Sequence, residues 1–151
     1  MTVGHNRAVA GDVIGRRDNK NKGRVTVILS EIKDLLDAEV LVGEDQMGMD
    51  VNTAFGADLM SDVLAFAKSG SLLLTGLTNP QVIRTADVLD IAAIIIVRAK
   101  RPSPETVKLA RDLGIPVLVT RFILFETAGR LYRAGIRGCL EKVDGSVHGH
   151  G

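Results

Sequence analysis

The chain has 151 residues, which is enough for one domain with a hydrophobic core of ordinary size. Hydrophobic residues make up 46% of it and charged residues 25%, a globular balance, and the longest unbroken apolar run, residues 91–97, is too short to cross a bilayer. The single cysteine, Cys139, excludes an internal disulfide and a zinc site built from cysteines. Because the first residues contain no apolar signal-peptide core, we expect a cytoplasmic protein with no membrane partner.

The formal net charge of +1 is unevenly distributed along the chain. Residues 1–24 contain six basic and two acidic residues, so this segment carries +4 and the remainder −3. The segment has no apolar periodicity, and we predict a disordered basic leader rather than an arm that binds nucleic acid. The chain also has few aromatic side chains on which bases could stack. Nucleic acid is therefore not expected as a partner.

The first part of the folded region, from residue 25, gives mixed signals. Ile28, Ile32 and Leu35 share a helical face, and Ser30 is the predicted N-cap of that helix. Residues 39–43 predict a short strand that ends in glycine. Residues 44–57 predict a loop with a short edge strand around residues 49–53. Apolar side chains then recur with helical spacing from Met60 to Ala67, which predicts an amphipathic helix.

Three short apolar runs in the second part predict buried strands. Residues 71–76, 91–99 and 115–120 each contain a run that is apolar at consecutive positions rather than at alternate ones, as in strands that are covered on both faces. Helical patterns separate the runs, and two successive crossover connections make the three strands parallel. We therefore predict an α/β fold with three layers, α/β/α, and a largely parallel sheet. The domain is expected to span residues 25–138, followed by a flexible tail at 139–151.

The helices between these strands have recognisable starts and stops. Asn79 followed by Pro80, and Ser103 followed by Pro104, each place a capping side chain before a proline at the first helical position. Gly114 predicts the end of the second of these helices. A last helix is predicted over residues 122–134, with a glycine as its stop.

Polar and basic residues follow each of the three predicted strands. Because the carboxyl ends of parallel strands open on one edge of the sheet, these residues are expected to lie together there. Hydroxyl groups, cations and helix N-termini suit an anion such as a phosphate group or a nucleotide. An alternative is that the polar groups serve only as helix caps and the cations only face solvent. The candidate ligand site comprises Thr75, Gly76, Thr78, Asn79, Arg98, Lys100, Arg101, Thr120 and Arg121.

No catalytic residue, cofactor or metal site is expected. The segment around Gly76 lacks the spacing and the lysine of a P-loop. Asp58 and Asp62 are four residues apart and could share a helical face, but two carboxylates make a weak metal site. All three histidines fall in the predicted leader and tail, so no serine or cysteine has a histidine base in the folded region.

Three stretches of the sequence carry a resemblance to a known family. The words "LLLTGLTNPQVIRTADVLDIAAIIIV", "RPSPETVKLARDLGIPVLVT" and "FETAGRLYRAGI" resemble the DRTGG domain, over residues 26–136. The chain is also similar to the N-terminal domain of HPr kinase/phosphorylase. The letters that name the family are not intact: its Asp-Arg pair appears as residues 77–79, and its Thr-Gly-Gly as Arg98, Ala99 and Lys100.

The resemblance implies a non-catalytic regulatory or interaction domain that senses a nucleotide or another anion and forms a homodimer. An unidentified protein partner would receive the signal. The alternative, a phosphotransfer enzyme related to HPr kinase, is disfavoured because that activity resides in a P-loop domain that this sequence lacks. Apolar residues that supply either the core or a self-complementary interface are Leu59, Met60, Phe66, Phe122 and Phe125.

Overall fold

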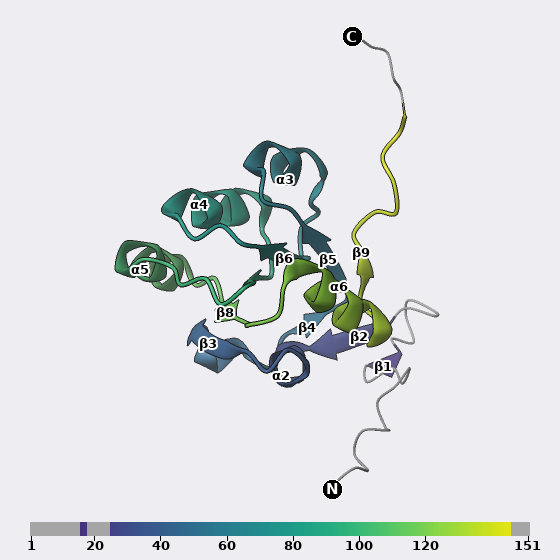
Figure 1. Cartoon of the computed structure of the whole chain (residues 1–151), viewed down its shortest axis with the longest axis horizontal. Coiled ribbons are helices and arrows are strands. Elements are labelled where there is room, and N and C mark those ends of the chain that lie inside the picture. The colour runs from purple at the N-terminus through teal and green to yellow at the C-terminus, as the bar shows by residue number, and fades with distance from the viewer. Residues whose placement is uncertain (1–15, 18–24, 146–151) are drawn as a thin grey trace, which may run out of the picture.

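A six-stranded sheet forms the centre of the fold (Figure 1). In their order across the sheet, its strands are β3 Glu39–Val42, β8 Val117–Val119, β7 Ala93–Ile96, β6 Leu72–Thr75, β5 Thr53–Gly56 and β9 Arg137–Gly138. The computed structural model describes residues 16–17 and 25–145. The pairs β5–β6, β6–β7, β7–β8 and β5–β9 are parallel, and only β3 runs antiparallel to its neighbour β8. The predicted largely parallel sheet is confirmed.

Helices cover both faces of the sheet, which confirms the three-layer α/β/α architecture (Figure 1). The strand β6 shows how the faces divide: Leu73 packs among α3 Met60–Phe66, α4 Pro80–Leu89 and α5 Pro104–Leu113. Its neighbours Leu72 and Leu74 pack on the opposite face, where α2 Leu29–Leu35 and α6 Leu124–Arg133 lie. Because both faces are buried, β6 and β7 are apolar at nearly every position.

A smaller antiparallel sheet lies beside the face that carries α2. Its strands are β1 Arg16–Arg17, β2 Val25–Ile28 and β4 Asp50–Val51, in the order β1-β2-β4. β1 belongs to the segment for which the sequence predicts a disordered leader, and its two residues pair with β2. Residues 1–15 and 18–24 lie outside the described residues, so the leader as a whole stays a prediction.

The predicted caps of α4 and α5 are confirmed. Asn79 Oδ1 accepts a hydrogen bond from the N–H of Val82, and Ser103 Oγ accepts one from the N–H of Thr106. Each helix begins at the proline that follows its cap. Gly114, with a left-handed φ of 71°, ends α5 as expected.

The prediction of Ser30 as an N-cap is wrong. The helix α2 begins at Leu29, with Ile28 as its N-cap. Backbone carbonyls replace a capping side chain here: the N–H of Leu29 donates to the carbonyl of Met49 (2.9 Å), and the N–H of Ser30 donates to that of Met47 (2.8 Å). The chain passes directly from β2 into the helix because a distant loop satisfies the first free N–H groups.

For residues 44–57 the predicted short edge strand around residues 49–53 is confirmed as β4 Asp50–Val51, at the edge of the smaller sheet, but the rest of the predicted loop needs correction. The segment holds a 3-10 turn at Glu44–Gln46, the short strand β4, and β5, which the sequence pattern did not reveal. The strand β5 lies inside the main sheet, between β6 and β9. Its sequence gives no apolar run because Ala54 and Gly56 are small and only Phe55 packs as a large apolar side chain.

The last helix and the start of the predicted tail are both tied to the sheet. The helix α6 spans Leu124–Arg133, slightly less than the predicted 122–134. β9 then pairs with β5, and the backbone N–H of Cys139 donates to the carbonyl of Ala54 (3.0 Å). The described chain continues to residue 145, and residues 146–151 of the predicted tail lie outside it.

Candidate functional site

The carboxyl ends of β6, β7 and β8 lie side by side. Thr75 is paired with Ile96 in the parallel register, and Ile96 with Val119. Hydrogen bonds continue past the strand ends: the N–H of Val97 donates to the carbonyl of Thr75 (3.0 Å), and that of Thr120 donates to the carbonyl of Ile96 (2.9 Å). The loops that follow the three strands therefore meet at one edge of the sheet, the place where open parallel sheets bind ligands.

Asp58, between β5 and α3, binds the end of β6. Its Oδ1 accepts hydrogen bonds from the backbone N–H of Gly76 (2.8 Å) and from the hydroxyl of Thr75 (3.0 Å). The Thr75 hydroxyl also accepts from the N–H of Leu77 (3.2 Å) and is fully buried. Asp58 and Asp62 do not share a helical face, because Asp58 lies before α3. Sequence reasoning missed this role, which depends on the pairing of β5 with β6.

The guanidinium group of Arg98 lies over the backbone of Gly76. A Cβ atom added to Gly76 would come within 2.7 Å of Arg98 Cζ, so a side chain at this position would displace the guanidinium group. Arg98 Nη1 is 4.0 Å from Asp58 Oδ2, and the two side chains are 41% and 47% exposed. An ion pair this long and this exposed is weak. Arg98 forms no side-chain hydrogen bond within the described chain, so its N–H donors are open to a ligand.

Arg98 belongs to a turn with an unusual backbone. Arg98 and Ala99 both have left-handed φ angles, 63° and 56°. Their N–H groups donate to the carbonyls of Phe122 and Thr120, each at 2.9 Å, and these bonds fasten the turn to the loop after β8. Left-handed residues that carry side chains are uncommon and concentrate at functional sites.

Besides Thr75, three further predicted site residues have functional groups that the fold already uses. Asn79 caps α4, and the buried Thr120 donates its hydroxyl hydrogen bond to the carbonyl of Leu36 (2.7 Å). Arg101 forms two hydrogen bonds with Glu39 on β3, at 2.7 and 3.3 Å. These bonds, and then the positive charge of Arg101, lower the pKa of Glu39 below its ordinary value. The stabilisation is therefore present above the ordinary pKa of a glutamate and is lost as the pH falls through the lowered value.

Other predicted site residues keep their side chains open. Lys100 and Arg121 are exposed, and neither side chain forms an ion pair or hydrogen bond with any part of the chain that the structure describes. Thr78 is partly exposed in the loop before α4. Together with Arg98, these residues provide three cations and a hydroxyl in the loops after the strands. We call these four residues, together with Asp58, Thr75 and Gly76, the carboxyl edge.

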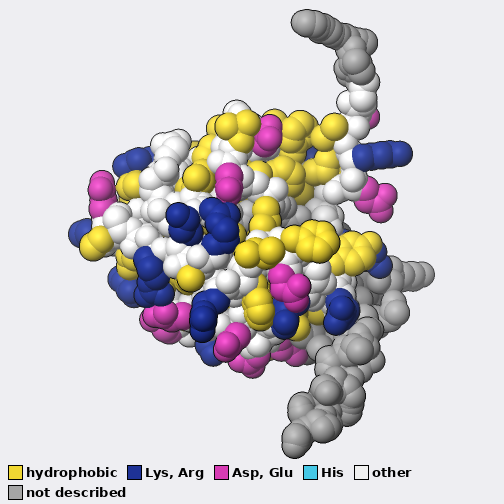
Figure 2. All heavy atoms as spheres, viewed as in Figure 1, with side chains coloured by type: hydrophobic (Ala, Val, Ile, Leu, Met, Phe, Trp, Pro, Cys, Tyr) yellow, Lys and Arg dark blue, Asp and Glu magenta, His cyan; other side chains and the backbone are white. Residues whose placement is uncertain are grey.

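A second candidate region lies around α6. Apolar side chains gather over this helix and beside it on the face shown in Figure 2. The most exposed of them is Phe125, at 83%, followed on the same helix by Tyr132 at 59%, while Ile123, just before the helix, is 57% exposed. Phe122, by contrast, packs partly buried against the core. Large apolar side chains this exposed, and this close together, are typical of interaction surfaces.

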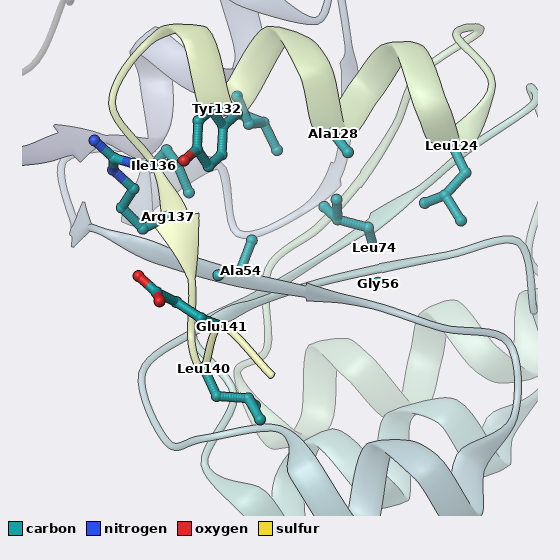
Figure 3. Close-up of a pocket in the computed structure, with 12 residues that line it drawn as sticks. Ala54, Gly56, Leu74, Leu124, Ala128, Tyr132, Ile136, Arg137, Leu140 and Glu141 are labelled. Atoms are coloured by element: carbon teal, nitrogen blue, oxygen red, sulfur yellow. Dashed lines mark hydrogen bonds between the residues drawn. The ribbon is translucent and has the colours of Figure 1, made fainter. Parts of the chain in front are cut away.

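A groove of about 570 Å³ separates α6 from β5 and the segment after β9 (Figure 3). Leu124, Ala128 and Tyr132 face it from α6, opposite Ala54 and Gly56 on β5. The groove exists because the side chains on its floor are small. Its size is within the range of ligand pockets. Sequence reasoning missed it, although the small residues at 54, 56, 128 and 138 were a readable signal.

The described residues hold no group of three or more histidine, cysteine, aspartate or glutamate side chains that could bind a metal ion. Within the same residues, no helix has the length and apolar character needed to cross a membrane.

Comparisons with known proteins identify the fold. The DRTGG domain profile matches residues 31–134. A similar solved structure is that of the CBS and DRTGG domains of the regulatory region of Clostridium perfringens pyrophosphatase, complexed with the activator diadenosine tetraphosphate. The two chains are 20% identical with a TM-score of 0.59, and the likeness covers 72% of this chain and 47% of that chain. No curated protein sequence matches the chain.

At 20% identity, the likeness to the pyrophosphatase region shows the fold alone, and this chain spans about half the length of that one. The profile match covers most of the fold, because residues 31–134 include most of the helices and every strand of the main sheet except β9. The protein belongs to the DRTGG domain family.

Proposed function

We propose that this DRTGG domain is a non-catalytic regulatory domain that binds a nucleotide or a related phosphorylated anion at the carboxyl edge. The observation that carries the proposal is the placement of Arg98: its guanidinium lies over Gly76, and no side chain of the described protein occupies its hydrogen-bond donors. Lys100 and Arg121 add two unpaired cations in the neighbouring loops of the described chain. Cations with open donors bind phosphate oxygens strongly.

The helix α4 adds a further favourable element. It is ten residues long and begins directly after the loop that holds Gly76 and Thr78. Its N-terminal end carries partial positive charge, although Pro80 has no N–H and the N–H of Val82 is already capped by Asn79. The regulatory region of the clostridial pyrophosphatase, which contains a DRTGG domain, is complexed with a nucleotide activator. This complex supports a nucleotide as the class of ligand. The cytoplasm is the predicted location of the protein.

Binding of ATP tests the proposal. ATP at a concentration 100 times its dissociation constant should stabilise the protein by about 2.7 kcal/mol, which thermal unfolding measures directly. Replacing Arg98 and Lys100 together by alanine should lower the affinity by roughly a hundredfold or more, because charge-assisted hydrogen bonds contribute about 1.5–3 kcal/mol each.

The matched control is Lys108→Ala, which removes a lysine on α5 that is paired with Asp112 instead of lying at the carboxyl edge. This variant should bind ATP as the unmodified protein does. Unchanged ATP affinity in the Arg98 and Lys100 variant would place the site elsewhere. Turnover of ATP by the purified protein would favour the alternative, a phosphotransfer enzyme.

We also propose that the domain self-associates through the face that carries α6. Phe125, Tyr132 and Ile123 are exposed there beside an apolar groove, so one surface offers both projecting aromatic side chains and a hollow that can receive them. A surface with both features suits a twofold contact, in which each copy presents the same patch. Homodimer formation would leave the carboxyl edge of each copy with its own set of cations.

A further inference from the structure

The carboxylate of Asp58 stands beside the cations of the carboxyl edge, where an anionic ligand meets a negative charge. Its Oδ1 is held by the N–H of Gly76 (2.8 Å) and the hydroxyl of Thr75 (3.0 Å). These two bonds fix the carboxylate, because Thr75 is fully buried and Gly76 follows directly from β6. Asp58 is therefore held at the carboxyl edge through one of its two oxygens.

The second oxygen of this carboxylate is open. Asp58 Oδ2 receives no hydrogen bond from the described residues, and its one charged neighbour among them, Arg98 Nη1, is 4.0 Å away. The side chain of Asp58 is 47% exposed and that of Arg98 is 41% exposed. The carboxyl edge thus presents a free acceptor, Oδ2, next to a free set of donors on Arg98. A ligand that fits both must carry an anionic group and a hydrogen-bond donor close together.

We infer that Asp58 is a specificity-determining residue, which accepts a hydroxyl of the ligand at Oδ2 while the phosphoryl group contacts Arg98. The inference rests on the proposed function and narrows its ligand class to phosphate esters with sugar hydroxyls, such as nucleotides. Carboxylates accept ribose hydroxyls in other parallel α/β proteins, because two acceptor oxygens match neighbouring hydroxyl donors. Free polyphosphate brings no donor, so Asp58 only repels it.

Two ligands that differ only in their hydroxyls test the inference. ATP and 2′,3′-dideoxy-ATP carry the same charge and the same base, and binding of each can be measured by titration calorimetry. The unmodified protein should bind ATP about ten- to hundredfold more tightly, the range expected for a hydrogen bond to a charged group. In Asp58→Asn this preference should fall to about threefold or less, and the affinity for tripolyphosphate should rise because the repulsion is gone.

Asp58→Asn is a conservative variant, because its amide oxygen can still accept from Gly76 and Thr75. The matched control is Asp62→Asn, which removes a carboxylate in the first turn of α3 that forms no hydrogen bond or ion pair with the carboxyl edge among the described residues. This control should keep the full preference for ATP. A merely structural role of Asp58 would lower the affinities for both nucleotides together and leave their ratio unchanged.

The outcomes separate the two proposals. Equal affinities of the unmodified protein for ATP and 2′,3′-dideoxy-ATP would overturn the role of Asp58, while the proposed function would stand. A preference for ATP that persists in Asp58→Asn would overturn that role as well. Absence of ATP binding in the unmodified protein and in both variants would overturn the proposed function, and the role of Asp58 with it.

Discussion

Arg98 and Ala99 adopt a left-handed backbone that glycine takes without steric cost. The resemblance to the family places its Thr at Arg98 and its two glycines at Ala99 and Lys100, so of the two left-handed residues only Ala99 stands where the family motif has a glycine. A left-handed conformation costs a residue with a Cβ atom about 1 kcal/mol. At Arg98 the same position supplies the guanidinium group over Gly76. Stability and ligand binding are therefore opposed at this residue.

Glycine substitutions separate the two effects. Arg98→Gly and Ala99→Gly should each raise the free energy of unfolding by about 1 kcal/mol, because each relieves a left-handed residue. Only Arg98→Gly should also weaken ATP binding, since Ala99 contributes no charged side chain. Urea denaturation and calorimetric titration measure the two quantities. A loss of stability in Ala99→Gly would show that the backbone of this turn is not strained.

The elements that the sequence predicts well are those with strong local signals. β6, β7 and β8 are continuous apolar runs, and α4 and α5 begin with a capping residue followed by proline. The strand β5 was missed because Ala54 and Gly56 give it no apolar run, and its place is determined by pairing with β6. The sequence predicts Ser30 as the cap of α2, but the carbonyls of Met47 and Met49 accept the first hydrogen bonds of this helix instead. Because these carbonyls belong to a loop beyond the helix, no local pattern predicts them.

The candidate site was predictable in outline only. The sequence brings Thr75, Arg98 and Thr120 to one edge, because the ends of parallel strands must meet there. It does not show that Thr120 uses its hydroxyl to bind the carbonyl of Leu36, or that Arg101 pairs with Glu39. Those contacts join elements more than 60 residues apart, and no local pattern records them.

Two buried threonines allow one substitution to be compared in opposite contexts. Thr120 donates a hydrogen bond to the Leu36 carbonyl, whereas Thr85, in α4, has a buried hydroxyl without a partner among the described residues. Thr120→Val should lower the free energy of unfolding by about 1–3 kcal/mol, because it leaves a buried carbonyl unsatisfied. Thr85→Val should leave it unchanged or raise it by about 1 kcal/mol. Denaturant unfolding measures the stability of both variants. Equal destabilisation would contradict the assignment of a hydrogen bond to the Thr120 hydroxyl and of none to the Thr85 hydroxyl.

At the scale of the whole molecule, the proposed self-association makes the face around α6 responsible for whether the domain is a monomer or a dimer. Replacing Phe125 by glutamate should convert a dimer to a monomer, since it places a charge in the middle of the apolar surface. Val88→Glu is the matched control: Val88 is 74% exposed, but it lies on α4, in the opposite layer. Light scattering across a range of concentrations gives the mass of each variant. An unmodified protein that stays monomeric at high concentration would exclude self-association.

β3 and β9 close the two edges of the sheet, and they are the first and the last of its six strands in chain order. Glu39 pairs with Val119, and Thr53 pairs with Arg137. Because the N-terminal part leaves the ribosome first, β3 has no pairing partner in this sheet until β8 has emerged. In the same way, one edge of β5 stays unpaired until β9 has emerged. Open edges pair readily with other chains. The nascent protein is therefore exposed to edge-to-edge pairing with other chains until β9 has emerged and paired with β5.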